Sequence, residues 1–515
     1  MNQPVKKSLL KSSFVVAMAT MLSRVLGLAR DIVFAGYFGA GGAQDAFFVA
    51  FKVPNFLRRL FAEGAFNQAF IPVLSEYKHA EGDDSVRKLV SAVQIYLGAV
   101  VGLVTLVAVI GSPVVAWAFA AGYHDSPEQL AMVADFLRLT FPYLWFISLT
   151  ALGSSVLNSY GRFSAPALAP VLLNLCLIGS AIFLSPYFEV GQTGLAIGVL
   201  IAGLAQWLFI MPSLYKTGVW SLFSWHTQHP GVKKILLLML PAMFGVSVSQ
   251  INLLLDTLLA TFLENGSVSW LYFSDRLVEL PLGIFGIAIA TVLLPRLSSL
   301  HSEKDGGKFT TTLAWAIQMV LMLGLPAAVA LIILPHELLT LLFQRGEFLP
   351  EHVSKSAQSL MAYSLGLPAF MLIKVLAPAF FARQDTKTPV KVGIQAMVWN
   401  MVFNLMLIYP LGHVGLALAT SLSAWLNAGL LALALRKLNQ LPSKEILLGP
   451  ILKVVMASVV MAAALLLALT QSIFTMPVGL FGQIAVVAML VFIGAAIYFV
   501  SLLAVGVRPK HLRHP

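Results

Sequence analysis

The sequence contains one cysteine, Cys176, and few charged residues. A single cysteine excludes an internal disulfide framework and a metal site built from several cysteine ligands. Only 11% of the residues are charged, compared with about 25% in a typical soluble domain. Hydrophobic residues make up 59%, and the mean hydropathy is +0.87. This composition excludes an ordinary soluble domain and predicts an all-α polytopic membrane protein.

Motifs of common enzymes are also missing. The sequence has no Walker A motif, no HExxH and no GxSxG. Its ten histidines fall mainly in predicted loops or near the chain ends, where a solvated side chain is the usual outcome. We therefore expect a transporter rather than an enzyme, with no cofactor.

Long apolar runs separated by charged or turn-forming breaks predict fourteen membrane-spanning helices. Lys6, Lys7 and Lys11 precede the first run without a cleavage motif, so no cleavable signal peptide is expected. The predicted spans are 13–38, 45–71, 88–112, 130–157, 166–185, 193–215, 235–262, 269–297, 311–334, 355–381, 389–409, 414–436, 450–470 and 481–505.

The basic residues outside these spans are distributed very unevenly. If the N-terminus is cytoplasmic, 23 basic residues in the loops or at the span ends lie on the cytoplasmic side and two, Arg345 and Lys355, on the other. The positive-inside rule then predicts that both termini are cytoplasmic. Topology thus explains the net charge of +11, and no nucleic-acid partner is expected.

Two pairs of segments repeat at an offset of a little over 220 residues. AFIPVLSEY, with Pro72, resembles VLLPRLSSL, with Pro295, and GLAIGVLIAG from Gly194 resembles GLALATSLSA from Gly415. The offset corresponds to six spans, which gives both copies the same orientation. We therefore predict an N-lobe at 1–222, a C-lobe at 223–440 with a cavity between the lobes, and a two-helix hairpin at 441–515.

Charged residues inside the first two spans indicate a polar cavity. A charge at mid-membrane costs roughly 2.5–3.5 kcal/mol, so several together favour a wet, protein-enclosed site. The helical repeat places most of them within arcs of roughly 120° and 80°. An alternative is that ion pairs such as Arg30–Asp31 or Arg59–Glu63 only fix packing. The candidate residues of these spans are Arg24, Arg30, Asp45, Lys52, Arg58, Arg59 and Glu63.

The eighth span, the repeat of the second, carries Asp275, Arg276 and Glu279. Lys374 in the tenth span either extends the basic lining or reaches the membrane surface. Basic groups outnumber acidic ones, and arginine matches phosphate oxygens with two parallel hydrogen bonds. These residues predict a site for a diphosphate.

A second polar cluster suits a monovalent cation. Asp256 lies inside an apolar run, Asn400 and Asn404 share one helical face, and Thr420 lies on the next span. Oxygen ligands of this kind bind hard cations, although ordinary hydrogen bonds between helices are an alternative. Coupling to Na⁺, to H⁺ or to the membrane potential is therefore a hypothesis.

Four stretches resemble the MurJ (MviN) lipid II flippase family of the multidrug/oligosaccharidyl-lipid/polysaccharide exporter superfamily. They are SRVLGLARD, DAFFVAFKVPNFLRRLFAEGAFNQAF, SVSWLYFSDRLVELPLGIFG and VLAPAFFARQDTKTPVK. The resemblance implies that a lipid-linked peptidoglycan precursor moves from the inner to the outer leaflet by alternating access. It also implies that the C-terminal hairpin borders a groove for the lipid tail.

The resemblance further implies a location in the bacterial inner membrane and lipid II and membrane lipids as partners. We expect the chain to function as a monomer. Two alternatives stay open from the residues: a flippase for another diphosphate-linked glycan, and an ion-coupled multidrug exporter. The basic character of the predicted cavity favours the diphosphate ligands over the drug exporter.

Overall fold

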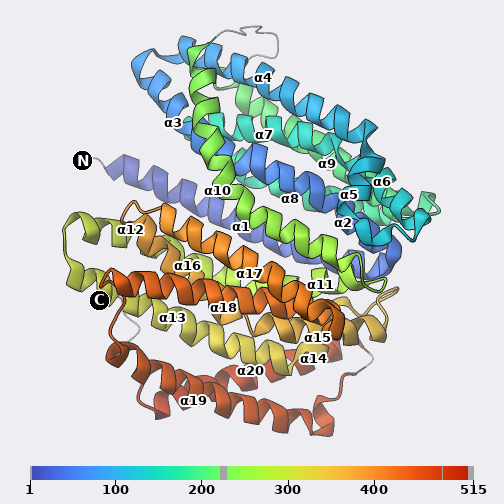
Figure 1. Cartoon of the computed structure of the whole chain (residues 1–515), viewed down its shortest axis with the longest axis vertical. Helices are drawn as coiled ribbons and strands as arrows, with labels where there is room; N and C mark the ends of the chain where they lie inside the picture. The colour runs from blue at the N-terminus through green and yellow to red at the C-terminus, as the bar shows by residue number, and fades with distance from the viewer. Residues whose placement is uncertain (1–2, 221–228, 478, 508–515) are drawn as a thin grey trace. The chain divides into compact units, whose positions relative to one another are not determined.

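The computed structural model describes residues 3–220, 229–477 and 479–507. The described residues form helices joined by short connections, and no strand occurs among them. The chain divides into two compact units, Met1–Ser269 (unit 1) and Trp270–Pro515 (unit 2). Figure 1 shows the helices of both units. The expectation of an all-helical protein is confirmed.

Unit 1 begins with a long helix and contains nine further α-helices and two π-helical segments among its described residues. Its principal elements are α1 (Gln3–Phe38), α2 (Gly42–Arg58), η1 (Arg59–Gly64), α3 (Ala65–Ala80), α4 (Asp83–Ile110), α5 (Ser112–Phe119), η2 (Ala121–Tyr123), α6 (Pro127–Thr140), α7 (Pro142–Ser159), α8 (Ser164–Gly179), η3 (Ser180–Leu184), η4 (Ser185–Tyr187), α9 (Gln192–Tyr215) and α10 (Pro230–Ala260).

Unit 2 begins at Trp270, which lies within α11; the first three residues of α11 belong to unit 1. Its elements are α11 (Ser267–Pro281), η5 (Leu282–Gly286), α12 (Ile287–Ser302), α13 (Gly306–Ile333), α14 (Pro335–Phe343), α15 (Pro350–Ser364), α16 (Leu367–Phe381), α17 (Lys387–Leu411), α18 (His413–Lys437), α19 (Lys444–Leu469), η6 (Ser472–Phe474) and α20 (Leu480–Ala504).

Eleven helical segments in the described part of the chain are long and apolar enough to cross a membrane. They correspond to the predicted spans three to six and eight to fourteen. The first, second and seventh predicted spans are not among them; the first two carry most of the charges within the membrane region. The chain is thus a multi-pass membrane protein, while the count of fourteen spans and their division into lobes stay predictions.

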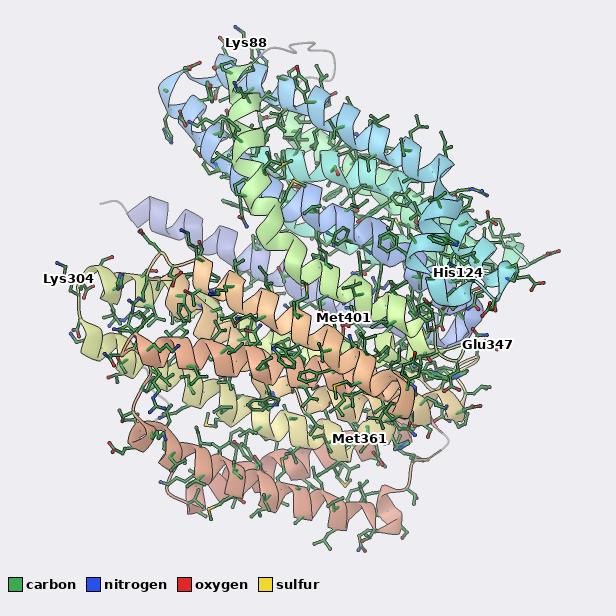
Figure 2. All side chains as sticks on the ribbon, viewed as in Figure 1. Lys88, His124, Lys304, Glu347, Met361 and Met401 are labelled. Carbon is green, nitrogen blue, oxygen red and sulfur yellow. The ribbon has the colours of Figure 1, made fainter. Side chains whose placement is uncertain are left out.

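The core of unit 1 forms where α3, α4, α7 and α9 meet. Phe70, Leu152 and Leu214 are completely buried there, and Trp207 and Trp220 pack edge to face at 5.5 Å. Because these side chains come from helices far apart in the sequence, their burial fixes a bundle against which α2 packs through α7 and α9, while α1 packs against α8. In Figure 2 Lys88 and His124 mark opposite ends of this unit.

Helix α10 packs within unit 1, although the sequence assigns it to the C-lobe. It lies against α2, η1, α3 and α4. Near its first residue the Lys234 ammonium pairs with the Glu76 carboxylate of α3, and the His229 ring lies 4.7 Å from that of Tyr77. Burial lowers the pKa of His229, whose Nδ1 accepts a hydrogen bond from the Gly231 amide.

The last two helices, α19 and α20, lie side by side and pack against α13 (Figure 1). Met461, Leu465 and Leu490 are buried in this contact, and the Tyr498 hydroxyl donates to the Met322 carbonyl at 2.6 Å. Helices α19 and α20 are therefore a pair of apolar helices attached to α13, while the predicted domain boundary at 441 stays a prediction.

The repeated sequence segments have a counterpart in the backbone. The π-helices η1 and η5 begin at Arg59 and Leu282, and this offset of 223 residues also separates Pro72 and Pro295. A π-helix of this kind is uncommon and often marks a functional position. Each unit thus interrupts an α-helix with a π-turn at the same place in the repeat.

Two glycines at the other repeat sites allow close backbone approach. A Cβ on Gly415 would lie 2.2 Å from the Leu407 carbonyl oxygen, and one on Gly194 would lie 2.7 Å from the Ser185 backbone. Glycine therefore permits the tight connection that precedes α9 in unit 1 and α18 in unit 2.

Replacing Gly415 with alanine should lower stability by about 1–3 kcal/mol, because the added methyl group overlaps the carbonyl of α17. Gly429→Ala on the same helix is the matched control, since its Cβ would meet nothing within 4 Å. That variant should be neutral or stabilised by about 0.5–1 kcal/mol. Unfolding of the purified proteins in one detergent measures both. Equal stability of the two variants would contradict the close approach.

Candidate functional site

Helix α1 presents one buried and one exposed arginine. The Arg30 side chain is buried, and its guanidinium donates to Oδ1 of Asp31 through Nε at 3.0 Å and Nη2 at 2.7 Å. Nη1 donates to Asn174 of α8 at 3.1 Å, and the Asn174 amide donates back to the Ser23 carbonyl. Arg30 is thus compensated inside unit 1 and holds α1 to α8. This geometry agrees with the alternative in which the Arg30–Asp31 ion pair fixes helix packing.

Arg24 lies about two turns before Arg30 on α1, and its side chain is exposed. An exposed guanidinium in a membrane-spanning helix keeps its charge and its five donors accessible to a ligand. Arg24 therefore has the accessibility that an anion-binding role requires.

Neutral oxygen acceptors orient two basic residues of α2 and η1. Lys52 donates to the Thr257 hydroxyl at 2.8 Å, and Arg59 donates to the Gln250 amide oxygen at 3.0 Å. Both acceptors lie on α10 and are seven residues apart. Lys52 and Arg59 are also seven residues apart. Two antiparallel helices are therefore joined by bonds two turns apart.

Arg58 ends α2 and Arg59 begins η1, so the arginine pair sits where the helix changes its repeat. Arg58 donates to the Asn55 side chain at 3.1 Å, and Asn55 donates to the Phe51 carbonyl. The Glu63 side chain lies outside the described residues, so its predicted role is still a prediction.

Asp45 near the start of α2 is fully buried and accepts three hydrogen bonds. Its donors are the Gly266 amide at 2.7 Å, the Ser269 amide at 2.8 Å and the Ser269 hydroxyl at 2.5 Å. Backbone N–H groups at a helix start have no partner within the helix, and the helix dipole there favours a negative charge. Asp45 is therefore a remote cap for α11, a geometry distinct from direct contact with a substrate.

Buried polar atoms without a partner surround this cap. Among the described residues, both polar atoms of the Gln44 side chain and the hydroxyls of Tyr123 and Ser267 have no hydrogen-bond partner. Gln44 and Ser267 are completely buried and Tyr123 is nearly so. Burial, together with the charge of Asp45, raises the pKa of Tyr123. Internal water is the usual partner of such groups.

Helix α11 in unit 2 carries the other predicted charges. Arg276 donates to Glu279 at 2.8 Å and to the Tyr272 hydroxyl at 3.1 Å, and its guanidinium lies 5.0 Å from the Tyr272 ring centre. The two partners of the ion pair are 34% and 52% exposed, so the pair contributes about 0–1 kcal/mol. A pair that weak leaves Arg276 able to change partners. Asp275 is half-buried beside it.

Lys374 is exposed on α16. Its Cγ lies 3.9 Å from the position that a Cβ on Gly286 would take, so its stem runs along η5. The structure thus places this lysine beside the π-helix of unit 2.

The four residues of the predicted cation site fall in different units. Asp256 is half-buried on α10 of unit 1, 3.5 Å from the Asn252 amide nitrogen. In unit 2 the buried Asn404 donates to Asn400 at 2.9 Å, and the Thr420 hydroxyl donates to the Leu416 carbonyl. These bonds fit the interhelical alternative, while the oxygen donors of unit 2 also suit a hard cation. Cation binding stays a prediction.

Sequence reasoning missed the partners of the charged residues. Asn174, Gln250, Thr257 and Ser269 orient Arg30, Arg59, Lys52 and Asp45 from helices far away in the sequence. A polar residue in an apolar run is the one signal that could have found Asn174, Gln250 and Thr257. Nothing in the sequence connects Ser269 to Asp45.

The fold defines a multi-pass helical membrane protein whose charged helices present arginine and lysine. Solved transporters share its fold: an inward-facing multidrug resistance MATE family transporter of the MOP superfamily has a TM-score of 0.67 at 17% identity, over 82% of this chain and 97% of that chain.

The chain belongs to the family of lipid II flippase MurJ, whose family model matches residues 34–486. A probable lipid II flippase MurJ from Vibrio cholerae is 48% identical over 99% of this chain and 98% of its own length. The one from Haemophilus influenzae is 44% identical over 96% of this chain and 99% of its own length.

A solved structure described as lipid II flippase MurJ in an inward closed conformation has a TM-score of 0.80 at 28% identity. The match covers 95% of this chain and 98% of that chain. The resemblance seen in the sequence is thus confirmed.

Removing the acidic partner of Arg30 should destabilise unit 1 strongly. Asp31→Ala leaves a buried guanidinium without its carboxylate, which typically costs about 3–5 kcal/mol. The matched control is Asp84→Ala, which breaks an ion pair with Arg87 whose side chains are 50% and 84% exposed. That change should cost about 1 kcal/mol or less. Unfolding in the same detergent compares the two, and similar losses would contradict the structural role of the Arg30–Asp31 pair.

The capping role of Asp45 can be tested at the start of α11. Asp45→Ala removes the acceptor of the Gly266 and Ser269 amides, so their hydrogen exchange should become faster by one or more orders of magnitude. Loss of a helix cap costs about 0.5–2 kcal/mol, and a buried donor left without a partner adds to this. The amides of the α4 core are the internal control. Unchanged exchange at residues 266–269 would contradict the cap.

Proposed function

We propose that this protein moves lipid II from the inner to the outer leaflet of the bacterial inner membrane. The observation that carries the proposal is family membership: relatives named lipid II flippase MurJ are 48% and 44% identical over nearly the whole chain. The apolar helices and the basic residues within the membrane region agree with such a substrate. No chemical bond of the substrate needs to change, so the activity is transport.

The physical problem is the transfer of a diphosphate and a large polar head group through hydrocarbon. Leaving such groups without hydrogen bonds or counter-charges would cost many kcal/mol, which makes unassisted crossing extremely slow. Arginine retains its charge at any depth and binds phosphate oxygens in pairs. We propose that Arg24, Arg58 and Arg59 of unit 1 and Arg276 and Lys374 of unit 2 supply these contacts.

The acidic residues then have a different task from the basic ones. The Asp45 carboxylate holds the start of α11, and Asp31 fixes the buried Arg30. Glu279 occupies Arg276 through a weak, exposed ion pair that a phosphate can replace. In this proposal the carboxylates set the positions of helices and arginines, and the diphosphate binds where a guanidinium is accessible.

Alternating access requires helices that can change their course. The π-turns η1 and η5 interrupt the charged helices of the two units, η1 within the arginine pair at Arg59 and η5 shortly after Arg276. Kinks and bends commonly occur at such turns. We propose that bending at η1 and η5 moves the basic side chains between the two faces of the membrane.

The lipid tail has to stay in hydrocarbon during the transfer. The paired helices α19 and α20 expose mainly apolar side chains and carry few charges. We propose that they border the path of the polyprenyl tail, that both termini are cytoplasmic and that the chain acts as a monomer. Coupling to a cation at Asp256, Asn400, Asn404 and Thr420, or to the membrane potential, completes the cycle.

Removing an accessible arginine should abolish function without unfolding the protein. Arg24→Ala and Arg59→Ala should fail to support growth of cells depleted of their own lipid II flippase, with normal amounts of protein in the membrane. Arg87→Ala is the matched control, because Arg87 is exposed at the start of α4 and pairs with Asp84. Full growth with Arg24→Ala and Arg59→Ala would contradict the proposed diphosphate contacts. If the wild-type protein supports growth only of cells that lack a flippase for another diphosphate-linked glycan, the alternative substrate is favoured.

A further inference from the structure

One end of unit 2 contains a cluster of two histidines, a tryptophan and a lysine. The Trp270 indole nitrogen donates to Nδ1 of His352 at 3.3 Å. The His413 ring lies 5.0 Å from the indole, and the Lys355 ammonium lies 5.2 Å from the indole centre. Nε2 of His413 is 3.1 Å from the Lys355 carbonyl. We call these four residues the tryptophan–histidine cluster.

The cluster joins three helices of unit 2. Trp270 lies in the first turn of α11, His352 and Lys355 lie on α15, and His413 begins α18. Trp270 and His413 are buried at 3% and 5% exposure, while His352 and Lys355 are partly buried. The hydrogen bonds and ring contacts of the cluster therefore fix the start of α11 against α15 and α18.

The position of the cluster within unit 2 gives it access to one side of the membrane. Figure 2 shows Glu347 and Lys304 at opposite ends of this unit. His352 follows Glu347 by five residues, so the cluster lies at the Glu347 end. The distribution of basic residues assigns that end to the outer side, where pH follows the surrounding medium.

The hydrogen bond from Trp270 determines the protonation state of His352. An indole N–H can only donate, so Nδ1 of His352 has to accept and the ring has to be neutral. If Nδ1 of His352 carried a proton, two N–H donors would face each other and the hydrogen bond from Trp270 would be lost. Lys355 lies at the same indole, so protonation of His352 would place two cations next to one ring. The two cations would repel each other, and their cation–π contacts with the indole would oppose that repulsion.

The other ionisable groups near His352 come from three helices. Glu351, the preceding residue on α15, is a carboxylate whose charge acts on His352. His413 of α18 contacts the same indole. Helix α14, which packs against α15, carries His336 and Glu337. Histidine is the group of this set whose charge normally changes between pH 5 and 8.

We propose that the tryptophan–histidine cluster is a proton-binding site that releases the start of α11 when the outer medium becomes acidic. The proton binds at Nδ1 of His352, and the Trp270 indole loses its acceptor. Asp275, Arg276 and Glu279 lie one to three turns further along α11. Release of the first turn of α11 therefore changes the anchoring of the helix that carries Asp275, Arg276 and Glu279.

The indole nitrogen of Trp270 gives a direct test in the full-length protein. Protein labelled with ¹⁵N-tryptophan in nanodiscs is titrated from pH 8 to pH 5, and the Trp270 indole resonance is assigned with Trp270→Phe. In the wild type this resonance should shift with one midpoint inside that range. In His352→Asn, whose amide oxygen replaces Nδ1 as an acceptor without taking up a proton, the shift should disappear.

Two further variants separate the proposed site from a general effect of pH. His124→Asn is the matched control, because His124 stacks on Trp117 at 5.1 Å in unit 1, outside the cluster; this variant should keep the Trp270 titration. If His352→Asn does not fold, His352→Gln serves the same purpose. A Trp270 resonance that does not respond to pH in the wild type, or that titrates equally in the His352 variant, would overturn the proposal. The measurement needs no lipid II, so its outcome is independent of the proposed function.

Discussion

The cost of placing charge in hydrocarbon is the constraint on which this structure depends. A charged side chain at mid-membrane costs several kcal/mol unless protein groups or water solvate it. The described residues meet this requirement in three ways. Arg30 and Asp31 neutralise each other, Asp45 caps a helix start, and Lys52 and Arg59 take amide and hydroxyl oxygens of α10. Arg24 and Lys374 stay exposed.

These arrangements divide the charged residues into two groups with different physical roles. Buried charges such as Arg30, Asp31 and Asp45 have partners with good geometry, so they fix the helices in place. Arg24 and Arg59 are exposed, and the partly buried Arg276 has an ion pair with Glu279 that costs little to exchange. A flippase needs both groups, because a binding site for a diphosphate has to be charged and has to move without losing its framework.

Much of the fold could be predicted from the sequence because hydrophobic runs report directly on the length of membrane helices. The repeat could also be found, since Pro72 and Pro295 recur at the offset that separates η1 from η5. The packing of α10 in unit 1 could not be predicted, because counting spans assigns a helix to a lobe only by its order. For the site, the charged residues were predictable and their partners were not: the bond between Asp45 and Ser269 joins positions 224 residues apart.

The central claim is that accessible arginines carry a diphosphate-linked lipid across the bilayer. Its most direct test is the leaflet accessibility of fluorescent lipid II in vesicles that contain the purified protein, its Arg24→Ala/Arg59→Ala variant or no protein. The wild type should move lipid II to the opposite leaflet far faster than empty vesicles, and the variant should match the empty vesicles. Transport by the variant at the wild-type rate, or no transport by the wild type, would contradict the account.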